Sequence, residues 1–320
     1  MSDPRPRVLV TRRLPSAVVA RLEAACDVDL HDDTEALSHD ALCARVRGAR
    51  GLVCMFNDRV DTAAIAAGDT LRVISTVAVG FDNIDVAAAA ARGIVVTNTP
   101  DILSGATAEL TWALILNVAR RVGEGDRAIR RGDWHGWTFD FLLGRELAGK
   151  RLGIVGGGRI GRTVAAAASA FGMEVVFATR TGRQSVDGPG AVVSLDELLR
   201  TSDVVSLHVP LTDATRHLID RRTLPRMKRS AILVNTSRGG VVDDAALAWA
   251  LEERLIAGAG LDVFDGEPAV HPGLIARDNV CLTPHLGSAT RETRTAMADL
   301  AARNVVEVLE GRPAVTPVGR

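Results

Sequence analysis

Residues 150–171 read KRLGIVGGGRIGRTVAAAASAF, and this stretch decides the fold of the chain. The apolar run 151–155 is typical of a buried strand, and an alanine-rich segment of helical character follows the glycines. Gly156 permits a tight turn between the two, and Gly161 lets the helix pack closely on the strand. The stretch therefore predicts a strand–turn–helix unit of a parallel α/β sheet.

The same stretch predicts a dinucleotide site. Glycines in the pattern G-x-G-x-x-G, placed between a strand and a helix, let the backbone approach a pyrophosphate, and Gly158 stands at the position of closest approach. The helix N-terminus adds N–H groups and the positive end of its dipole. We expect the cofactor to contact Gly156, Gly158, Arg159, Ile160 and Gly161.

The next strand of this unit bears on the choice of cofactor. NAD-binding proteins usually carry an acid at its end, but none lies between Glu174 and Asp187. Thr179, Arg180 and Arg183 occupy the region instead, and a guanidinium suits a 2′-phosphate. We expect NADP(H) to be preferred and NAD(H) to be possible. The alternative is that both arginines are solvated loop residues.

Short apolar runs alternate with helical patterns along the whole chain, which predicts an α/β protein. Eleven strands are too many for one ordinary open sheet, so we expect two Rossmann-like parallel-sheet domains, with the cofactor domain inserted in the substrate domain. Residues 1–99 and 288–320 would form a flavodoxin-like substrate-binding domain, and residues 100–287 a dinucleotide-binding Rossmann domain. The predicted strands are 7–11, 27–31, 51–55, 71–77, 95–97, 151–155, 174–178, 204–207, 231–235, 257–263 and 280–283, and long helices are predicted at 104–121 and 290–309.

Composition limits the classes of function. The 320 residues are 47% hydrophobic and carry a formal net charge of −1 without a block of like charges, which argues against a nucleic-acid partner. No run approaches the ~20 apolar residues of a membrane span, and the first residues lack the apolar core of a signal peptide. Four scattered cysteines indicate a reduced, cytoplasmic protein, and no metal site is expected.

Three further segments follow predicted strands, where open α/β sheets bind ligands. They are VNTSRGG (234–240), LDVFDGEP (261–268) and LTPHLG (282–287). Each alone fits an ordinary loop. Together, and with VAVGFDNID (77–85), SLHVPLT (206–212) and SRGGVVDDAAL (237–247), they resemble the D-isomer-specific 2-hydroxyacid dehydrogenase family. The resemblance covers essentially the whole chain.

The resemblance implies a catalytic role for Arg238, Glu267 and His285, and the chemistry fits these residue types. An arginine can hold the carboxylate of a 2-keto acid and polarise its carbonyl. A histidine can give a proton to the C2 oxygen as hydride reaches C2. A glutamate bonded to the other ring nitrogen would orient the imidazole and favour its charged form.

The resemblance also implies contacts around the cofactor and the substrate. Asp262 matches the acid that contacts the nicotinamide carboxamide, Thr107 a residue near the nicotinamide, and His208 and Pro210 a motif along the cofactor cleft. For His208 we favour packing over proton transfer. The residues expected at the substrate, besides Arg238 and His285, are Met55, Val79, Gly80, Ser288 and Trp137.

Within the family, the glyoxylate and hydroxypyruvate reductases look closest, through the segment 132–161 with Trp134 and Trp137. In those enzymes this stretch wraps a partner subunit, which implies a homodimer and makes Trp137 a candidate for the neighbour's pocket. The alternative is that both tryptophans only pack the interface. Met55 and Phe56 occupy the loop that faces the substrate side chain, without a basic residue for a phosphate.

Two other readings stay open. A 2-ketogluconate reductase, or another D-2-hydroxyacid dehydrogenase, would use the same residues on a larger small-molecule substrate. The family also resembles nucleotide-sensing transcriptional corepressors, which act mainly as binding proteins. Turnover separates the two classes, because a sensor should bind cofactor yet reduce glyoxylate only sluggishly.

Overall fold

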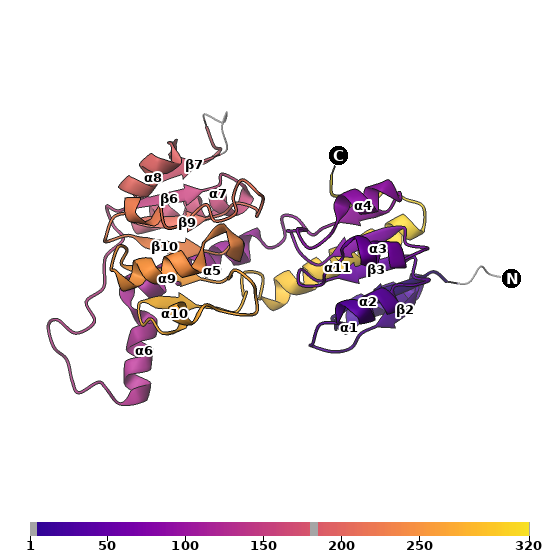
Figure 1. Ribbon diagram of the computed structural model, residues 1–320, viewed down its shortest axis with the longest axis horizontal. Helices are drawn as coiled ribbons and strands as arrows, with labels where there is room; N and C mark the ends of the chain where they lie inside the picture. Colours follow the sequence, from indigo (N-terminus) through magenta and orange to yellow (C-terminus); the bar gives the residue numbers. More distant parts are fainter. Residues whose placement is uncertain (1–4, 180–184, 320) are drawn as a thin grey trace. The chain divides into compact units, whose positions relative to one another are not determined.

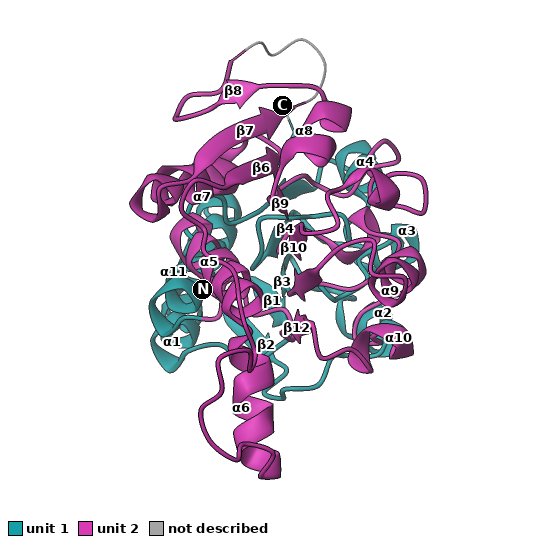
Figure 2. Ribbon diagram, turned by 90° about the vertical axis from the view of Figure 1, so that its left-hand side faces the viewer, with its two compact units in different colours: residues 1–103, 290–320 teal, residues 104–289 magenta. Residues whose placement is uncertain are grey.

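The computed structural model describes residues 5–179 and 185–319, and it divides into two compact units (Figure 2). The first unit consists of residues 1–103 and 290–320, and the second of residues 104–289. The first boundary falls where the long helix α5 (Ser104–Arg120) begins, and the second precedes α11 (Arg291–Leu309). The second unit is thus an insertion in the chain of the first.

The first unit is a five-stranded parallel sheet with the order β2-β1-β3-β4-β5. Helix α11 returns from the end of the chain to pack on β3, β4 and α1, and it buries Met297, Ala301 and Val305 (Figure 1). The elements are β1 (Arg7–Val10), α1 (Ser16–Ala25), β2 (Asp27–Leu30), α2 (His39–Arg45), β3 (Gly51–Cys54), α3 (Thr62–Ala67), β4 (Val73–Thr76), α4 (Val86–Ala91) and β5 (Val95–Thr97).

The second unit is a seven-stranded parallel sheet with the order β12-β11-β10-β9-β6-β7-β8. Its elements after α5 are α6 (Val122–Arg131), β6 (Arg151–Val155), α7 (Arg159–Ala168), η1 (Ser169–Phe171), β7 (Glu174–Ala178), β8 (Ala191–Val192), α8 (Leu195–Thr201), β9 (Val204–Leu207), η2 (Leu224–Arg226), β10 (Ile232–Asn235), η3 (Gly239–Val241), α9 (Asp244–Glu252), β11 (Gly258–Leu261), α10 (Pro272–Ile275) and β12 (Val280–Leu282).

The predicted fold class is confirmed, because both sheets are parallel and each is covered by helices. All eleven predicted strands are present. Most of their apolar runs are buried on both faces, as is typical of parallel strands, whereas the edge strand β2 is partly exposed. The sequence missed β8. That strand pairs only two residues with the edge of β7 and has too little apolar character to stand out.

The inserted sheet has two apolar layers. On one face, α5 and α7 bury Trp112, Ile115 and Val164 against β6 and β7. The other layer gathers Leu198 of α8 and Leu247 of α9. No helix within residues 5–179 and 185–319 combines the length and the apolar character needed to cross a bilayer.

Candidate active site

The three predicted catalytic residues follow three adjacent strands of the inserted sheet. Arg238 follows β10, Glu267 follows β11 and His285 follows β12. The strands end at the same level, because Asn235 pairs with Leu261 and Leu261 with Leu282 in parallel register. The sheet therefore gathers all three segments at its carboxyl edge, where open α/β sheets bind ligands.

Glu267 and His285 form a hydrogen-bonded pair. Nδ1 of His285 lies 2.8 Å from Oε2 of Glu267, while Oε1 of Glu267 accepts the backbone N–H of Phe264 at 3.0 Å. Burial acts to raise the pKa of Glu267, but the hydrogen bond and the charge of His285 outweigh it and hold the pKa below its usual value. Glu267 is thus a carboxylate that orients the imidazole.

Asp262 holds the loop that carries His285. Its side chain is 1% exposed. Its Oδ1 accepts hydrogen bonds from Thr283 Oγ1 and the Leu286 N–H, both at 2.6 Å, and its Oδ2 accepts the Gly287 N–H at 2.8 Å. His285 itself has φ +54°, an unusual conformation for a residue other than glycine, and its N–H donates to the Asp262 carbonyl. The sequence predicted Asp262 as a cofactor contact, and its part in shaping this loop was missed.

Arg238 lies on a turn that Asn235 organises. Oδ1 of Asn235 accepts the N–H and the hydroxyl of Ser237, and its Nδ2 donates to the Arg238 carbonyl at 2.9 Å. Arg238 Nη1 donates to the Ser237 carbonyl at 2.8 Å, and the guanidinium helps to lower the pKa of Glu267. Sequence reasoning did not single out Asn235, although a polar residue at the end of the apolar run ILVN was the available signal.

The glycine loop has the geometry that the motif predicts. Gly156 has φ +108°, and a Cβ there would lie 2.3 Å from the His208 carbonyl oxygen. A Cβ on Gly161 would lie 2.2 Å from the Gly156 carbonyl oxygen. Gly158 differs, because a Cβ there would meet no protein atom within 4 Å. Arg159 and Ile160 then form the first turn of α7. The loop thus leaves open the face where a pyrophosphate would approach, and these residues fit a dinucleotide.

The other predicted cofactor residues lie around this loop or beside the pair. Thr179 lies next to Gly157, since a Cβ on Gly157 would be 3.2 Å from Cγ2 of Thr179. Oγ1 of Thr107 donates to the Gly287 carbonyl at 3.1 Å. Pro210 is exposed, and its carbonyl accepts the hydroxyl of Thr215 at 2.6 Å. Arg180 and Arg183 lie outside the described residues.

His208 is a packed, uncharged imidazole. Its Nε2 is 2.8 Å from Ser206 Oγ, and burial lowers the pKa of His208 to about 4. The backbone carbonyl oxygen of His208 packs closely against Gly156 and leaves no room for a Cβ there. These features favour the packing role over proton transfer near neutral pH.

The predicted substrate residues Met55, Val79 and Gly80 lie on two neighbouring loops of the first unit. Asn83 joins these loops, because its Nδ2 donates to the carbonyls of Met55 and Asp58 at 3.0 and 2.8 Å. Buried Asp58 accepts the Met55 N–H at 2.7 Å. Sequence reasoning missed both residues, although Asn83 lies in the quoted run VAVGFDNID.

The two remaining predicted substrate residues belong to the second unit. Ser288 is partly exposed beside Gly287, on the loop after His285. Trp137 is 83% exposed in the single chain, on the segment between α6 and β6. In a single chain this side chain therefore mostly contacts solvent.

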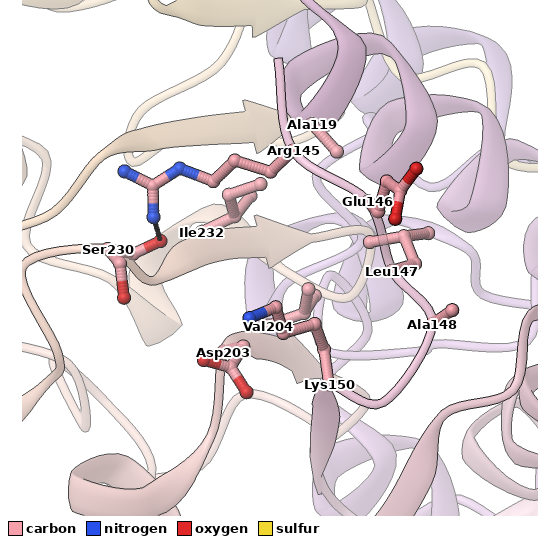
Figure 3. A pocket seen from close by; sticks show the side chains of 10 residues that line it. All are labelled: Ala119, Arg145, Glu146, Leu147, Ala148, Lys150, Asp203, Val204, Ser230 and Ile232. Atoms are coloured by element: carbon pink, nitrogen blue, oxygen red, sulfur yellow. Dashed lines mark hydrogen bonds between the residues drawn. The ribbon is translucent and has the colours of Figure 1, made fainter.

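A cavity of about 460 Å³ lies in the inserted unit at the first residues of β9 and β10, Val204 and Ile232 (Figure 3). Arg145 donates to the Ser230 carbonyl at its rim, at 2.8 Å, and Lys150 and Asp203 add charge. These strands begin at the cavity and end toward Arg238, so this cavity is distinct from the candidate active site.

Comparison with known proteins agrees with this arrangement. Residues 112–287 match the family described as D-isomer specific 2-hydroxyacid dehydrogenase, NAD binding domain. A glyoxylate reductase from Aeropyrum pernix is 48% identical over 316 residues, which cover 96% of this chain and 94% of that protein.

Solved structures extend the comparison. The crystal structure of a Thermus thermophilus protein superposes with a TM-score of 0.92 and 48% identity, over 98% of this chain and 100% of that one. An NADPH-dependent glyoxylate/hydroxypyruvate reductase from Sinorhizobium meliloti, solved with NADP and malonate, gives a TM-score of 0.86 and 33% identity, over 98% and 97% of the two chains. This chain belongs to the D-isomer specific 2-hydroxyacid dehydrogenase family.

Proposed function

We propose that this protein reduces small 2-keto acids, glyoxylate and hydroxypyruvate first among them, to 2-hydroxy acids. The observation that carries the proposal is the Glu267–His285 pair beside Arg238, at the carboxyl edge of a sheet that also presents a dinucleotide loop. The names of the Aeropyrum and Sinorhizobium relatives support the choice of substrate.

When bound, the reduced nicotinamide supplies the hydride to C2. His285 gives a proton from Nε2 to the C2 oxygen, since its Nδ1 is engaged by Glu267. The Glu267 carboxylate orients the imidazole through this hydrogen bond. Arg238 holds the substrate carboxylate with two parallel donors and polarises the carbonyl. Contacts of Val79 and Gly80 with the substrate stay a prediction.

A substrate panel tests the proposal. Glyoxylate, hydroxypyruvate, 2-ketogluconate and pyruvate are each supplied with NADPH and with NADH, and oxidation of the cofactor is followed by absorbance. We expect the highest kcat/KM with glyoxylate or hydroxypyruvate. A preference for 2-ketogluconate would replace the substrate within the same chemistry. Tight cofactor binding without turnover of any keto acid would favour the binding-protein alternative.

We further infer a preference for NADPH. The segment between Glu174 and Asp187 has no acid to repel a 2′-phosphate, and Arg180 and Arg183 are the proposed partners of that phosphate. A hydrogen bond to a charged group contributes roughly 1.5–3 kcal/mol, so we expect about tenfold to a hundredfold higher kcat/KM with NADPH. Arg180→Ala should lose most of this preference by weakening NADPH alone. Equal use of both cofactors by the unmodified enzyme would contradict it.

We also propose a homodimer. The segment between α6 and β6 exposes Trp134, Trp137, Phe139, Phe141 and Leu143, with Phe139 81% exposed. A run of large apolar side chains in water is typical of a protein interface. Trp137 is our candidate for a residue that reaches the partner's substrate pocket.

A further inference from the structure

Asp244 is a buried carboxylate outside the three proposed catalytic residues. It is the first residue of α9, yet it is only 8% exposed, whereas an acid in a first helical turn usually faces water. Its Oδ2 accepts the backbone N–H of Asp265 at 3.1 Å. Asp265 belongs to the segment that leads from β11 to Glu267, so this bond joins α9 to the chain that carries Glu267.

The peptide between Phe264 and Asp265 is confined on its other side by Gly239. A Cβ on Gly239 would lie 1.8 Å from the Phe264 carbonyl oxygen and 2.5 Å from the Asp265 nitrogen. Gly239 is the residue after Arg238, and the Phe264 N–H binds Glu267 Oε1 at 3.0 Å. Two successive peptides on either side of Phe264 therefore contact the Arg238–Gly240 turn and Glu267.

A second tie acts on the side chain of Asp265. Its Oδ2 lies 2.9 Å from His217 Nε2, and the His217 backbone N–H donates to the Gly240 carbonyl at 2.8 Å. Asp265 is thus held through its backbone by Asp244 and through its carboxylate by His217. The hydrogen bond to Asp244 connects Asp265 to α9, and the pair with His217 connects it to Gly240.

The charges around Asp244 make it sensitive to pH. Burial raises the pKa of Asp244 to about 6, and the carboxylates of Asp265 and Asp243 add to the rise. The Asp265 N–H and His271 act in the opposite direction. A carboxylate in this position costs folding free energy at neutral pH, and it binds the segment that leads to Glu267.

We infer that Asp244 is a positioning residue for the Glu267–His285 pair: its carboxylate fixes the Phe264–Asp265 peptide, and its protonation loosens Glu267. The inference rests on the proposed function for its kinetic consequence, while the positioning itself can be measured without a substrate. A neutral carboxyl is a weaker acceptor than a carboxylate, so the tie weakens as the pH falls.

Kinetics of three variants test the inference. Asp244→Ala removes the acceptor, and kcat should fall by on the order of tenfold to a hundredfold while the Kd of the cofactor stays unchanged. Asp244→Asn retains an acceptor oxygen without a charge. It should lose less activity. We expect the kcat of the wild type to decline as the pH falls through about 6, and the kcat of Asp244→Asn to lack this decline. Asp243→Asn is the matched control, because it removes the neighbouring charge from the N-cap of α9 and keeps a good cap.

Amide hydrogen exchange at Phe264 supplies a readout that needs no substrate, because this N–H donates to Glu267 Oε1 at 3.0 Å. The chain has seven phenylalanines, so ¹⁵N labelling of phenylalanine gives a simple spectrum, and Phe264→Leu identifies the line of Phe264. The protection factor of Phe264 should be the same in the wild type and in Asp243→Asn, and lower in Asp244→Ala. In the wild type it should also fall as the pH decreases through about 6, a change that Asp244→Asn should not show.

A Phe264 protection factor in Asp244→Ala equal to that of the wild type, or an Asp244→Ala enzyme with the kcat and pH profile of the wild type, would overturn the inference. If the wild type reduced no keto acid at all, the proposed function would fail while hydrogen exchange at Phe264 still decided the role of Asp244.

Discussion

At the scale of single residues, the site depends on backbone positions that other side chains hold. His285 has a left-handed φ of +54°, and Asp262 binds the loop around it through three donors. Asn235 does the same for the turn that carries Arg238. Because these carboxylate and amide groups are buried, each can orient its loop with little competition from water.

His285→Ala tests the proton donor. A positioned acid contributes about 10²–10⁴ in rate, so keto-acid reduction should fall by that factor. The cofactor Kd should be nearly unchanged, since the dinucleotide loop lies on β6 and α7. Stopped-flow reduction and fluorescence titration of NADPH measure the two quantities. Turnover near the wild-type rate would remove His285 from the mechanism.

Arg238→Lys tests the carboxylate contact. Lysine keeps the charge but loses the planar fork of donors, so we expect a higher KM and a lower kcat together. Arg222→Lys is the control, because Arg222 is an exposed arginine paired with Asp220 at 3.0 Å. An unaltered kcat/KM for glyoxylate in the Arg238 variant would show that another group binds the carboxylate.

Asp244→Asn should also change the pH dependence of stability. The pKa of Asp244 is raised from 3.8 to about 6, so the folded state binds more protons between these values and the wild type loses stability as the pH rises through them. Above pH 6 the variant should be more stable by on the order of 1–3 kcal/mol. Below pH 4 the difference should vanish. Urea unfolding above pH 6 and below pH 4 measures the difference in the free energy of unfolding between the two proteins. A difference that did not depend on pH would contradict the prediction.

At the scale of elements, the turn from β6 into α7 contains glycines that are needed for two different reasons. Gly161 is required by the protein itself, because α7 packs against the Gly156 carbonyl. Gly158 faces open space, so the protein alone places no such demand there. The same motif thus serves packing at one position and, in our proposal, the cofactor at the other.

Gly158→Ala and Gly161→Ala form a matched pair that tests this division. Gly158→Ala should keep the Tm of the wild type and weaken NADPH binding by about tenfold or more, since the methyl group enters the proposed pyrophosphate space. Gly161→Ala should lower the Tm by several degrees through overpacking, roughly 1–3 kcal/mol. Calorimetry with and without NADPH measures both effects. Unchanged affinity in Gly158→Ala would place the pyrophosphate elsewhere.

At the scale of the whole molecule, the aromatic segment between α6 and β6 is left exposed by the part of its own unit that the structure describes. Trp137 and Phe139 are more than four-fifths exposed among the described residues, although both are side chains that usually contribute to cores or interfaces. We propose that a second copy of the chain buries these side chains.

Light scattering at micromolar concentration should therefore give twice the mass of the 33.8 kDa chain. Replacing Trp137 and Phe139 together by Ser should shift the equilibrium toward monomers, because buried aromatic anchors dominate interface energetics. Trp134→Ser gives a comparison from the same segment. If Trp137→Ser alone raised the KM of glyoxylate in a dimer of normal mass, Trp137 would reach the partner's site. A monomeric wild type would contradict the proposal.

Among the described residues, the sequence by itself indicated every strand except β8, that the sheets are parallel, and where the dinucleotide loop lies. These features are local: apolar runs buried on both faces mark parallel strands, and three glycines at a set spacing mark the turn. The resemblance to the family, carried by several motifs in order along the chain, implied catalytic roles for Arg238, Glu267 and His285, and those roles stay predictions. Their hydrogen-bonded arrangement is consistent with the expectation, since Glu267 meets Nδ1 of His285.

Only the tertiary structure decided what holds those residues in place. Asp262, Asn235 and Asp244 act on loops, and the partners of Asp262 and Asp244 lie about twenty residues or more away in the chain. Which loops meet depends on the strand order β12-β11-β10-β9, and that order is set by packing of the whole sheet. A short polar residue looks the same in the sequence whether it faces water or caps a buried loop, so its role appears only when the sheet is assembled.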